Sequence, residues 1–200
     1  MSFTDNFGHP KGFLGRIMLA SMDREHLPMA VWAFTRFEIP REGEIVDIGC
    51  GGGYNIKRML SKCTEGKIYG FDISKESVKK ARKVNKDQIG KRVEILQGSV
   101  EKMPFADGQF DLATAFETVF FWPDPKENIH EVYRILKNGG RFVIINNYGD
   151  PNIDWEKKVP CMTRYTAEQL NEFMAGAGFK DIKTEKKDNL FCIEGTKQIN

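Results

Sequence analysis

The stretch that decides the fold is "EIVDIGCGGGYNI", residues 44–56. An apolar, strand-like run ends in Gly49, Gly51, Gly52 and Gly53, and a helix-like segment follows at once. Glycine adopts left-handed backbone angles that other residues avoid, and it loses the most entropy on folding. The spacing therefore predicts either a sharp turn between a strand and a helix or a place where a ligand lies directly against the backbone.

The chain after this loop alternates short apolar runs with amphipathic segments. Strands are expected at residues 44–49, 67–73, 92–96, 110–116 and 141–147, with an antiparallel pair at 180–186 and 190–197. This alternation is typical of an α/β fold, in which a mostly parallel sheet has helices on both faces. Ligands of such sheets bind beside the carboxyl ends of the strands.

Capping residues indicate where several helices begin and end. Ser74 and Asp124 each precede a helical pattern, and Pro125 follows Asp124, as is typical of helix starts. Thr166 and Gln169 have the spacing of a capping box,. The glycines of the run 138–140 are expected to end the helix that Asp124 begins.

The N-terminal part has a helical pattern. Apolar residues recur at helical spacing from Phe13 to Met22, and a second helix is expected from about residue 27 to residue 37,. Pro40 then interrupts the pattern. The sequence thus predicts a helical segment at residues 1–40 and a ligand-binding domain at residues 41–200.

Composition limits the class of protein. The 200 residues suit one domain with a sizeable core, and a net charge of +2 is too near neutral to favour nucleic acid or a membrane,. No apolar run approaches the roughly 20 residues of a spanning helix, and the N-terminus lacks a secretory signal pattern. The four cysteines form no CxxC pair, so we expect reduced thiols in the cytoplasm and no metal site,.

The glycine spacing distinguishes two classes of ligand. Dinucleotide sites require G-x-G-x-x-G, but Tyr54 lies three residues after Gly51 and Ile56 lies three after Gly53. The spacing therefore argues against a dehydrogenase. A single nucleoside with a small charged tail needs only a close approach to the backbone.

Two carboxylates stand near the loop. Asp72 ends the second expected strand, where it can accept hydrogen bonds from both hydroxyls of a ribose. Its alternative role, a helix cap, is better filled by Ser74. Asp47 lies just before the glycines, and its alternative role is a local bond to N–H groups of the loop.

Five features carry a family pattern: "DIGCGGG" at 47–53, Asp72, and the stretches 98–124, 131–144 and 165–182. Together they resemble the class I S-adenosylmethionine-dependent methyltransferases, most of all the small-molecule branch related to quinone-biosynthesis methyltransferases. The similarity covers about residues 44–197. It implies a Rossmann-like seven-stranded sheet of order 3-2-1-4-5-7-6, S-adenosylmethionine as cofactor, S-adenosylhomocysteine as product, and residues 1–40 as a lid.

The resemblance also implies which residues bind the cofactor. The glycine loop would hold the methionine tail, Asp72 the ribose, and Ile73 the adenine. The other implied contacts are Asp47, Gly49, Cys50, Gly51, Gly53, Gly98, Ser99, Val100, Ala115, Phe116 and Phe120. The family usually has an aspartate at Ser99, so the contact between this residue and the adenine amino group is expected to be weaker.

Methyl transfer from a sulfonium is an in-line displacement, which depends mostly on positioning and on exclusion of water. Glu117 is the only ionisable residue in the stretch that follows the fourth expected strand, and it is the candidate base if the acceptor must lose a proton,. Its alternatives are an exposed loop glutamate or a partner for Arg16. Aromatic residues are expected to line the pocket of a small organic acceptor: Phe13, Phe121, Tyr148 and Trp155.

Other functions remain open at this stage. The same loop and Asp72 would serve a non-catalytic S-adenosylmethionine binder that acts as a regulator or partner subunit. A nucleic-acid methyltransferase is disfavoured by the near-neutral charge and by "AFET" at 115–118, where the acidic-proline tetrad would begin,. We expect a monomer or a homodimer.

Overall fold

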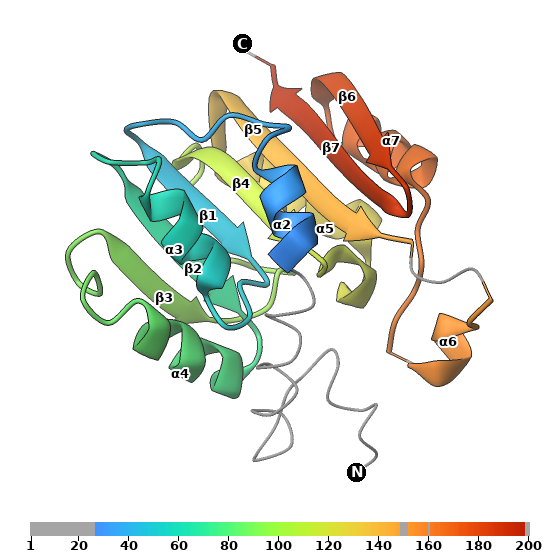
Figure 1. The fold of residues 1–200 in the computed structure, drawn as a ribbon. Coiled ribbons are helices and arrows are strands. Elements are labelled where there is room, and N and C mark those ends of the chain that lie inside the picture. The colour runs from blue at the N-terminus through green and yellow to red at the C-terminus, as the bar shows by residue number, and fades with distance from the viewer. Residues whose placement is uncertain (1–26, 149–151, 160, 199–200) are drawn as a thin grey trace.

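A seven-stranded sheet forms the centre of the protein, with helices on both of its faces (Figure 1). The computed structural model describes residues 27–148, 152–159 and 161–198. Its strands are β1 (Glu44–Ile48), β2 (Lys67–Asp72), β3 (Val93–Gln97), β4 (Phe110–Phe116), β5 (Leu136–Asn147), β6 (Phe179–Lys187) and β7 (Leu190–Lys197). Its helices are α2 (Leu27–Ala33), α3 (Tyr54–Leu60), α4 (Lys75–Val84), the short 3-10 helix η2 (Val119–Phe121), α5 (Pro125–Ile135), α6 (Trp155–Lys158) and α7 (Ala167–Gly176).

The strand order is β3-β2-β1-β4-β5-β7-β6, as the family resemblance implied. Strands β1 to β5 pair in parallel, and β7 runs antiparallel to both β5 and β6. The predicted α/β fold with a mostly parallel sheet is therefore confirmed. This pairing brings the carboxyl ends of β1, β2 and β4 together at one edge, where Asp47 and Thr114 are direct neighbours across two strands.

The sheet separates two apolar cores. On one face the strands pack against α2, α3 and α4, and on the other against α5 and α7. Neighbouring residues of one strand belong to different cores: Ile45 to the first and Val46 to the second. Burial on both faces explains why these strands are apolar runs rather than alternating patterns.

Helix α2 is shorter than predicted: it ends at Ala33 and not at residue 37. The Thr35 hydroxyl donates to the Trp32 carbonyl at 2.6 Å, and the Thr35 N–H donates to the same oxygen at 3.0 Å. These bonds compete with continuation of the helix. The chain turns there and places Phe34 and Phe37 in the core beside the sheet. Residues 27–39 thus pack directly on the domain, although the predicted boundary at residue 40 and the lid remain proposals.

The predicted end of α5 is also wrong. The helix ends at Ile135, and the extended Leu136 already pairs with Phe110 as the first residue of β5. Leu136 is fully buried, so packing pulls the chain into the sheet before the glycines are reached. A Cβ on Gly140 would lie 2.9 Å from the carbonyl oxygen of Phe110. This glycine therefore permits a close strand contact and does not cap a helix.

The predicted helix starts are confirmed. The Ser74 hydroxyl accepts from the Ser77 N–H at 3.3 Å, and Asp124 accepts from the Glu127 N–H at 3.2 Å. The capping box of α7 is complete, with both reciprocal bonds present. Within the residues that the structure describes, no helix has the length and apolar character needed to cross a membrane.

Candidate active site

The glycine loop leaves β1 at the carboxyl end of the sheet and turns sharply into α3. Gly49 has φ +74°, and a Cβ there would lie 2.1 Å from the Thr118 hydroxyl, so the loop touches the chain that leaves β4. Gly51 has φ +51°, and a Cβ there would meet no protein atom within 4 Å. The backbone at Gly51 therefore borders open space, as a close-approach site for a ligand requires. Gly53 instead packs on α4, since a Cβ added at this position would lie 2.8 Å from Ala81.

Asp72 fixes this loop from the end of β2. One carboxylate oxygen accepts from the Gly51 N–H at 2.8 Å, and the other accepts from the Ser74 N–H at 2.8 Å. The side chain is largely buried. Each carboxylate oxygen can accept more than one hydrogen bond. Asp72 therefore anchors the loop beside the pocket that it lines, while Ser74 serves as the helix cap.

Asp47 does not accept hydrogen bonds from the N–H groups of the glycine loop, which was its alternative role in the sequence analysis. The N–H groups of Gly49 and Cys50 donate to the Phe71 carbonyl, at 2.7 and 3.1 Å. The Asp47 carboxylate instead accepts from the Thr114 hydroxyl at 2.8 Å. Burial raises the pKa of Asp47 to about 7, although the hydrogen bond from Thr114 opposes this. Asp47 thus titrates near neutral pH.

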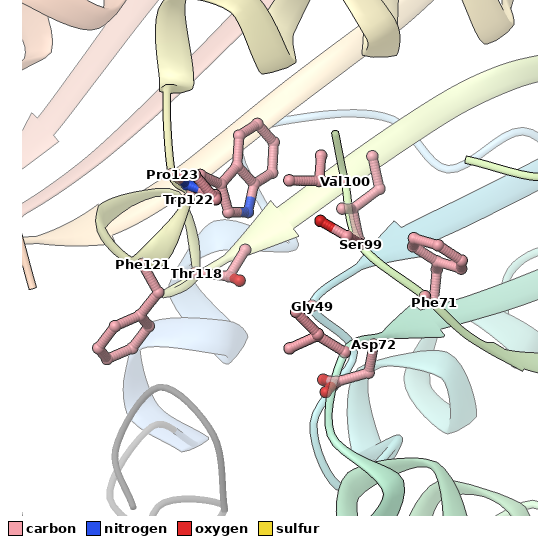
Figure 2. Close-up of a pocket in the computed structure, with 12 residues that line it drawn as sticks. Gly49, Phe71, Asp72, Ser99, Val100, Thr118, Phe121, Trp122 and Pro123 are labelled. Atoms are coloured by element: carbon pink, nitrogen blue, oxygen red, sulfur yellow. The ribbon is translucent and has the colours of Figure 1, made fainter. Parts of the chain in front are cut away.

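A pocket opens beside Gly49 and Asp72 (Figure 2). Asp72 and Ser99 line one side, and Thr118, Phe121 and Trp122 line the other. Its remaining lining residues are Ile48, Gly49, Phe71, Ile73, Gly98, Val100 and Pro123. The pocket volume is about 100 Å³, below the roughly 300–1,000 Å³ of whole small-molecule sites. A nucleoside would therefore fill this pocket with only one part and extend over the open glycine loop.

The pocket brings together Gly49, Asp72, Ile73, Gly98, Ser99 and Val100 of the predicted cofactor residues. Ile73 is 43% exposed, so part of its apolar side chain borders the open pocket. The Ser99 hydroxyl is within 2.7 Å of a Glu101 carboxylate oxygen, to which it donates. Phe121, predicted for the acceptor pocket, also lines this pocket.

Other predicted residues lie outside this pocket. Asp47, Cys50, Ala115, Phe116 and Phe120 are buried, and Phe116 packs on Phe34 with ring centroids 5.3 Å apart. Gly51 and Gly53 belong to the loop and do not line the pocket. Phe13, with the rest of residues 1–26, lies outside the described residues.

Comparison with known proteins identifies the family. Residues 46–144 match the family model described as "Methyltransferase domain". The chain is 28% identical over 167 residues to the "Uncharacterized methyltransferase YdaC" of Bacillus subtilis (strain 168), covering 84% of this chain and 88% of that protein. A solved structure of a putative S-adenosyl-L-methionine-dependent methyltransferase from Methanococcus maripaludis is 25% identical, with a TM-score of 0.73 over 92% of this chain and 94% of that one.

The chain belongs to the S-adenosylmethionine-dependent methyltransferases. It is also 29% identical over 154 residues to the demethylmenaquinone methyltransferase of Lactococcus lactis subsp. lactis (strain IL1403), covering 70% of this chain and 61% of that enzyme. It spans only 36–46% of the length of several other curated relatives. The cofactor of this methyltransferase is S-adenosylmethionine. In the described part of the chain, no group of three His, Cys, Asp or Glu residues could hold a metal ion.

Glu117 occupies a strained position in this methyltransferase, directly after β4. Its φ is +53°, which is uncommon for a residue with a side chain and often marks functional sites,. Its N–H donates to the Ile145 carbonyl at 2.8 Å, so it lies beside the end of β5. Burial raises the pKa of the Glu117 carboxyl to about 8, although a hydrogen bond from the Asn147 backbone opposes this. Glu117 is therefore not an exposed loop glutamate, and the alternative partner, Arg16, lies outside the described residues.

Tyr148 and Trp155 line a second hollow beyond β5, together with Arg164 and Tyr165. Tyr148 packs on Phe191 with ring centroids 4.6 Å apart. The two predicted acceptor residues are thus brought together by the structure, but they do not line the pocket of Figure 2.

Sequence reasoning missed two buried polar residues. Thr114 lies in the middle of "FDLATAF", and Asn146 lies in "IINN" at the end of β5. The Asn146 side-chain oxygen is buried and accepts no hydrogen bond from the described residues. A buried acceptor without a donor is uncommon. The signal was available, since both residues are polar interruptions of apolar strands next to the expected ligand edge.

Proposed function

We propose that this methyltransferase transfers the methyl group of S-adenosylmethionine to a small organic acceptor by in-line displacement. The observation that carries the proposal is the bond from the Gly51 N–H to Asp72, which holds an open glycine cradle beside the pocket. The cradle fits the cofactor, because a Cβ at Gly51 would project into the space that a closely bound ligand needs. The bound cofactor supplies an electrophilic methyl group on a cationic sulfur.

The proposed cofactor contacts follow from the lining of the site. Asp72 accepts from the ribose hydroxyls, and the exposed Ile73 packs on the adenine face. Gly98, Ser99 and Val100 border the adenine edge. Asp47, with the loop from Gly49 to Gly53, surrounds the methionine tail. Carboxylates at this edge favour a cationic ligand through Coulomb attraction in a low-dielectric site.

The acceptor is proposed to be a small molecule, because relatives such as the Lactococcus enzyme are named for one. Glu117 and Asn146 lie at the adjacent ends of β4 and β5, and they would bind a hydroxyl or amine of the acceptor. The aromatic side chains of Phe121, Tyr148 and Trp155 would exclude water. Location in the cytoplasm and assembly as a monomer or homodimer remain predictions.

Titration calorimetry with S-adenosylmethionine, S-adenosylhomocysteine and NADH tests the proposal first. We expect micromolar binding of the two sulfur nucleosides and none of NADH. Acceptor candidates, beginning with hydroquinones and phenols, are then screened for formation of S-adenosylhomocysteine. Binding without turnover on any acceptor would favour the non-catalytic binder, and failure to bind either nucleoside would contradict the site.

Asp72→Ala is expected to weaken S-adenosylmethionine binding about 10- to 100-fold, which corresponds to roughly 1–3 kcal/mol. The variant removes the proposed ribose acceptor and also the partner of the Gly51 N–H. The control is Asp107→Ala, since the Asp107 side chain is 82% exposed and pairs with Arg134. Calorimetry should show native affinity for the control, and unchanged affinity for Asp72→Ala would disprove the assignment.

Glu117→Gln is expected to lower turnover by roughly 10²- to 10⁴-fold if the acceptor loses a proton. A base acts in its ionised form, and the pKa of Glu117 is about 8. Native turnover should therefore rise with pH through about 8, whereas the variant should show no such rise. Glu94 is an exposed residue of the edge strand β3, and Glu94→Gln should behave as the native enzyme does. A native rise that persists in Glu117→Gln would exclude Glu117 as the base.

A further inference from the structure

A threonine hydroxyl lies inside the sheet next to the proposed cofactor site. Thr114 of β4 is fully buried and is the direct cross-strand partner of Asp47 in β1. Its hydroxyl is 2.8 Å from Asp47 Oδ1 and 3.5 Å from the Val46 carbonyl. The carboxylate is therefore the main acceptor, because an O–H···O bond is optimal near 2.7–2.8 Å.

The surroundings of Asp47 favour its neutral form. Among the residues that the structure describes, the titratable groups that interact with Asp47 are the Asp72 carboxylate on β2 and the Cys50 thiol in the glycine loop. Helix α2, on the same face of the sheet, has the sequence LPMAVWA and brings no charge. Among the described residues, no lysine or arginine forms an ion pair with Asp47. Burial and the Asp72 charge both raise the pKa of Asp47, and the Thr114 hydrogen bond lowers it.

We propose that Thr114 is a positioning residue, which favours the ionised form of Asp47 and orients its carboxylate toward the cationic end of the cofactor. This inference rests on the proposed cofactor site. A hydroxyl that donates to a carboxylate stabilises the charged form. Without it, the pKa of the buried Asp47 would rise further above its ordinary value, so the carboxyl would be mostly protonated at neutral pH and lose its attraction for the ammonium and sulfonium charges of S-adenosylmethionine. The β1–β4 pairing also places Oδ1 of Asp47 against the Thr114 hydroxyl, so Oδ2 is the oxygen that would face the ligand.

The test is the pH dependence of S-adenosylmethionine affinity, measured by calorimetry between pH 6 and 10. Thr114→Val keeps the shape of the side chain and removes the donor. We expect the rise of affinity with pH to move upward by roughly one to two pH units in this variant. Affinity near pH 7 should fall about 10- to 100-fold, while affinity at pH 10 should approach the native value. Thr114→Ser retains the donor and should restore the native profile.

Several results would overturn the inference. A native profile in Thr114→Val would show that the hydroxyl does not control Asp47. An equal loss of affinity at every pH would assign Thr114 a packing role only. If Thr114→Val does not fold, Thr114→Ser still decides, because a shifted profile in that variant contradicts the proposal. Failure of the native protein to bind S-adenosylmethionine at any pH would instead reject the cofactor site itself.

Discussion

Gly51→Val should lose at least about 100-fold in affinity for S-adenosylmethionine, equivalent to roughly 2.7 kcal/mol or more, and should keep the native fold. In the ligand-free protein, a Cβ at Gly51 would meet no atom within 4 Å beyond its chain neighbours. The added side chain therefore projects into the space proposed for the ligand. Calorimetry measures the loss of binding, and circular dichroism measures the retained fold.

Gly90→Val is the matched control for this variant. Gly90 also has a positive φ, +75°, and a Cβ there would likewise meet nothing within 4 Å. It lies before the start of β3, at the opposite end of the parallel sheet from the glycine loop. Both variants carry the cost of a branched residue in a left-handed conformation, roughly 1–3 kcal/mol. If both variants lost affinity to a similar extent, or if neither variant lost affinity, the Gly51 loop would be merely a tight turn.

Local sequence signals predicted the fold because each acts over a few residues. The caps at Ser74, Asp124 and Thr166 need only a side chain and an N–H group three residues later. The glycine loop was predicted for the same reason, since its conformation depends on its own backbone. The strand order followed from the family resemblance and was not available from local pattern.

The errors occurred where distant packing decides the outcome. The glycines at 139 and 140 look like a helix end, but burial of Leu136 against β4 ends α5 earlier. The partner of Asp47 was missed because Thr114 is 67 residues away and becomes its neighbour only through the β1–β4 register. Burial of Glu117 likewise depends on the end of β5. Such lateral contacts between strands are not encoded in the spacing of residues along one strand.

Asp47→Asn should make the ligand-free protein more stable at pH 8 and weaken its binding of S-adenosylmethionine. The pKa of Asp47 is about 7 in the folded protein, against 3.8 as the ordinary value. Below pH 3.8 the carboxyl is protonated in both the folded and the unfolded state, so burial of a charge costs nothing there. As pH rises from 3.8 to 7, the unfolded state releases its proton first, and the free energy of unfolding decreases.

An asparagine cannot ionise and can still accept from the Thr114 hydroxyl, so it avoids this loss. A shift of three pKa units corresponds to roughly 4 kcal/mol, and burial of the new amide N–H groups offsets part of it. We therefore expect a net gain of about 2 kcal/mol at pH 8 in urea denaturation, which shrinks toward pH 4. The control is Asp111→Asn at the other end of the same sheet, where the carboxylate accepts from Lys137 at 2.7 Å and from the Glu44 N–H at 2.8 Å. This control should lose stability at pH 8, and a comparable loss in Asp47→Asn would show that the charge at Asp47 stabilises the fold instead of serving the cofactor.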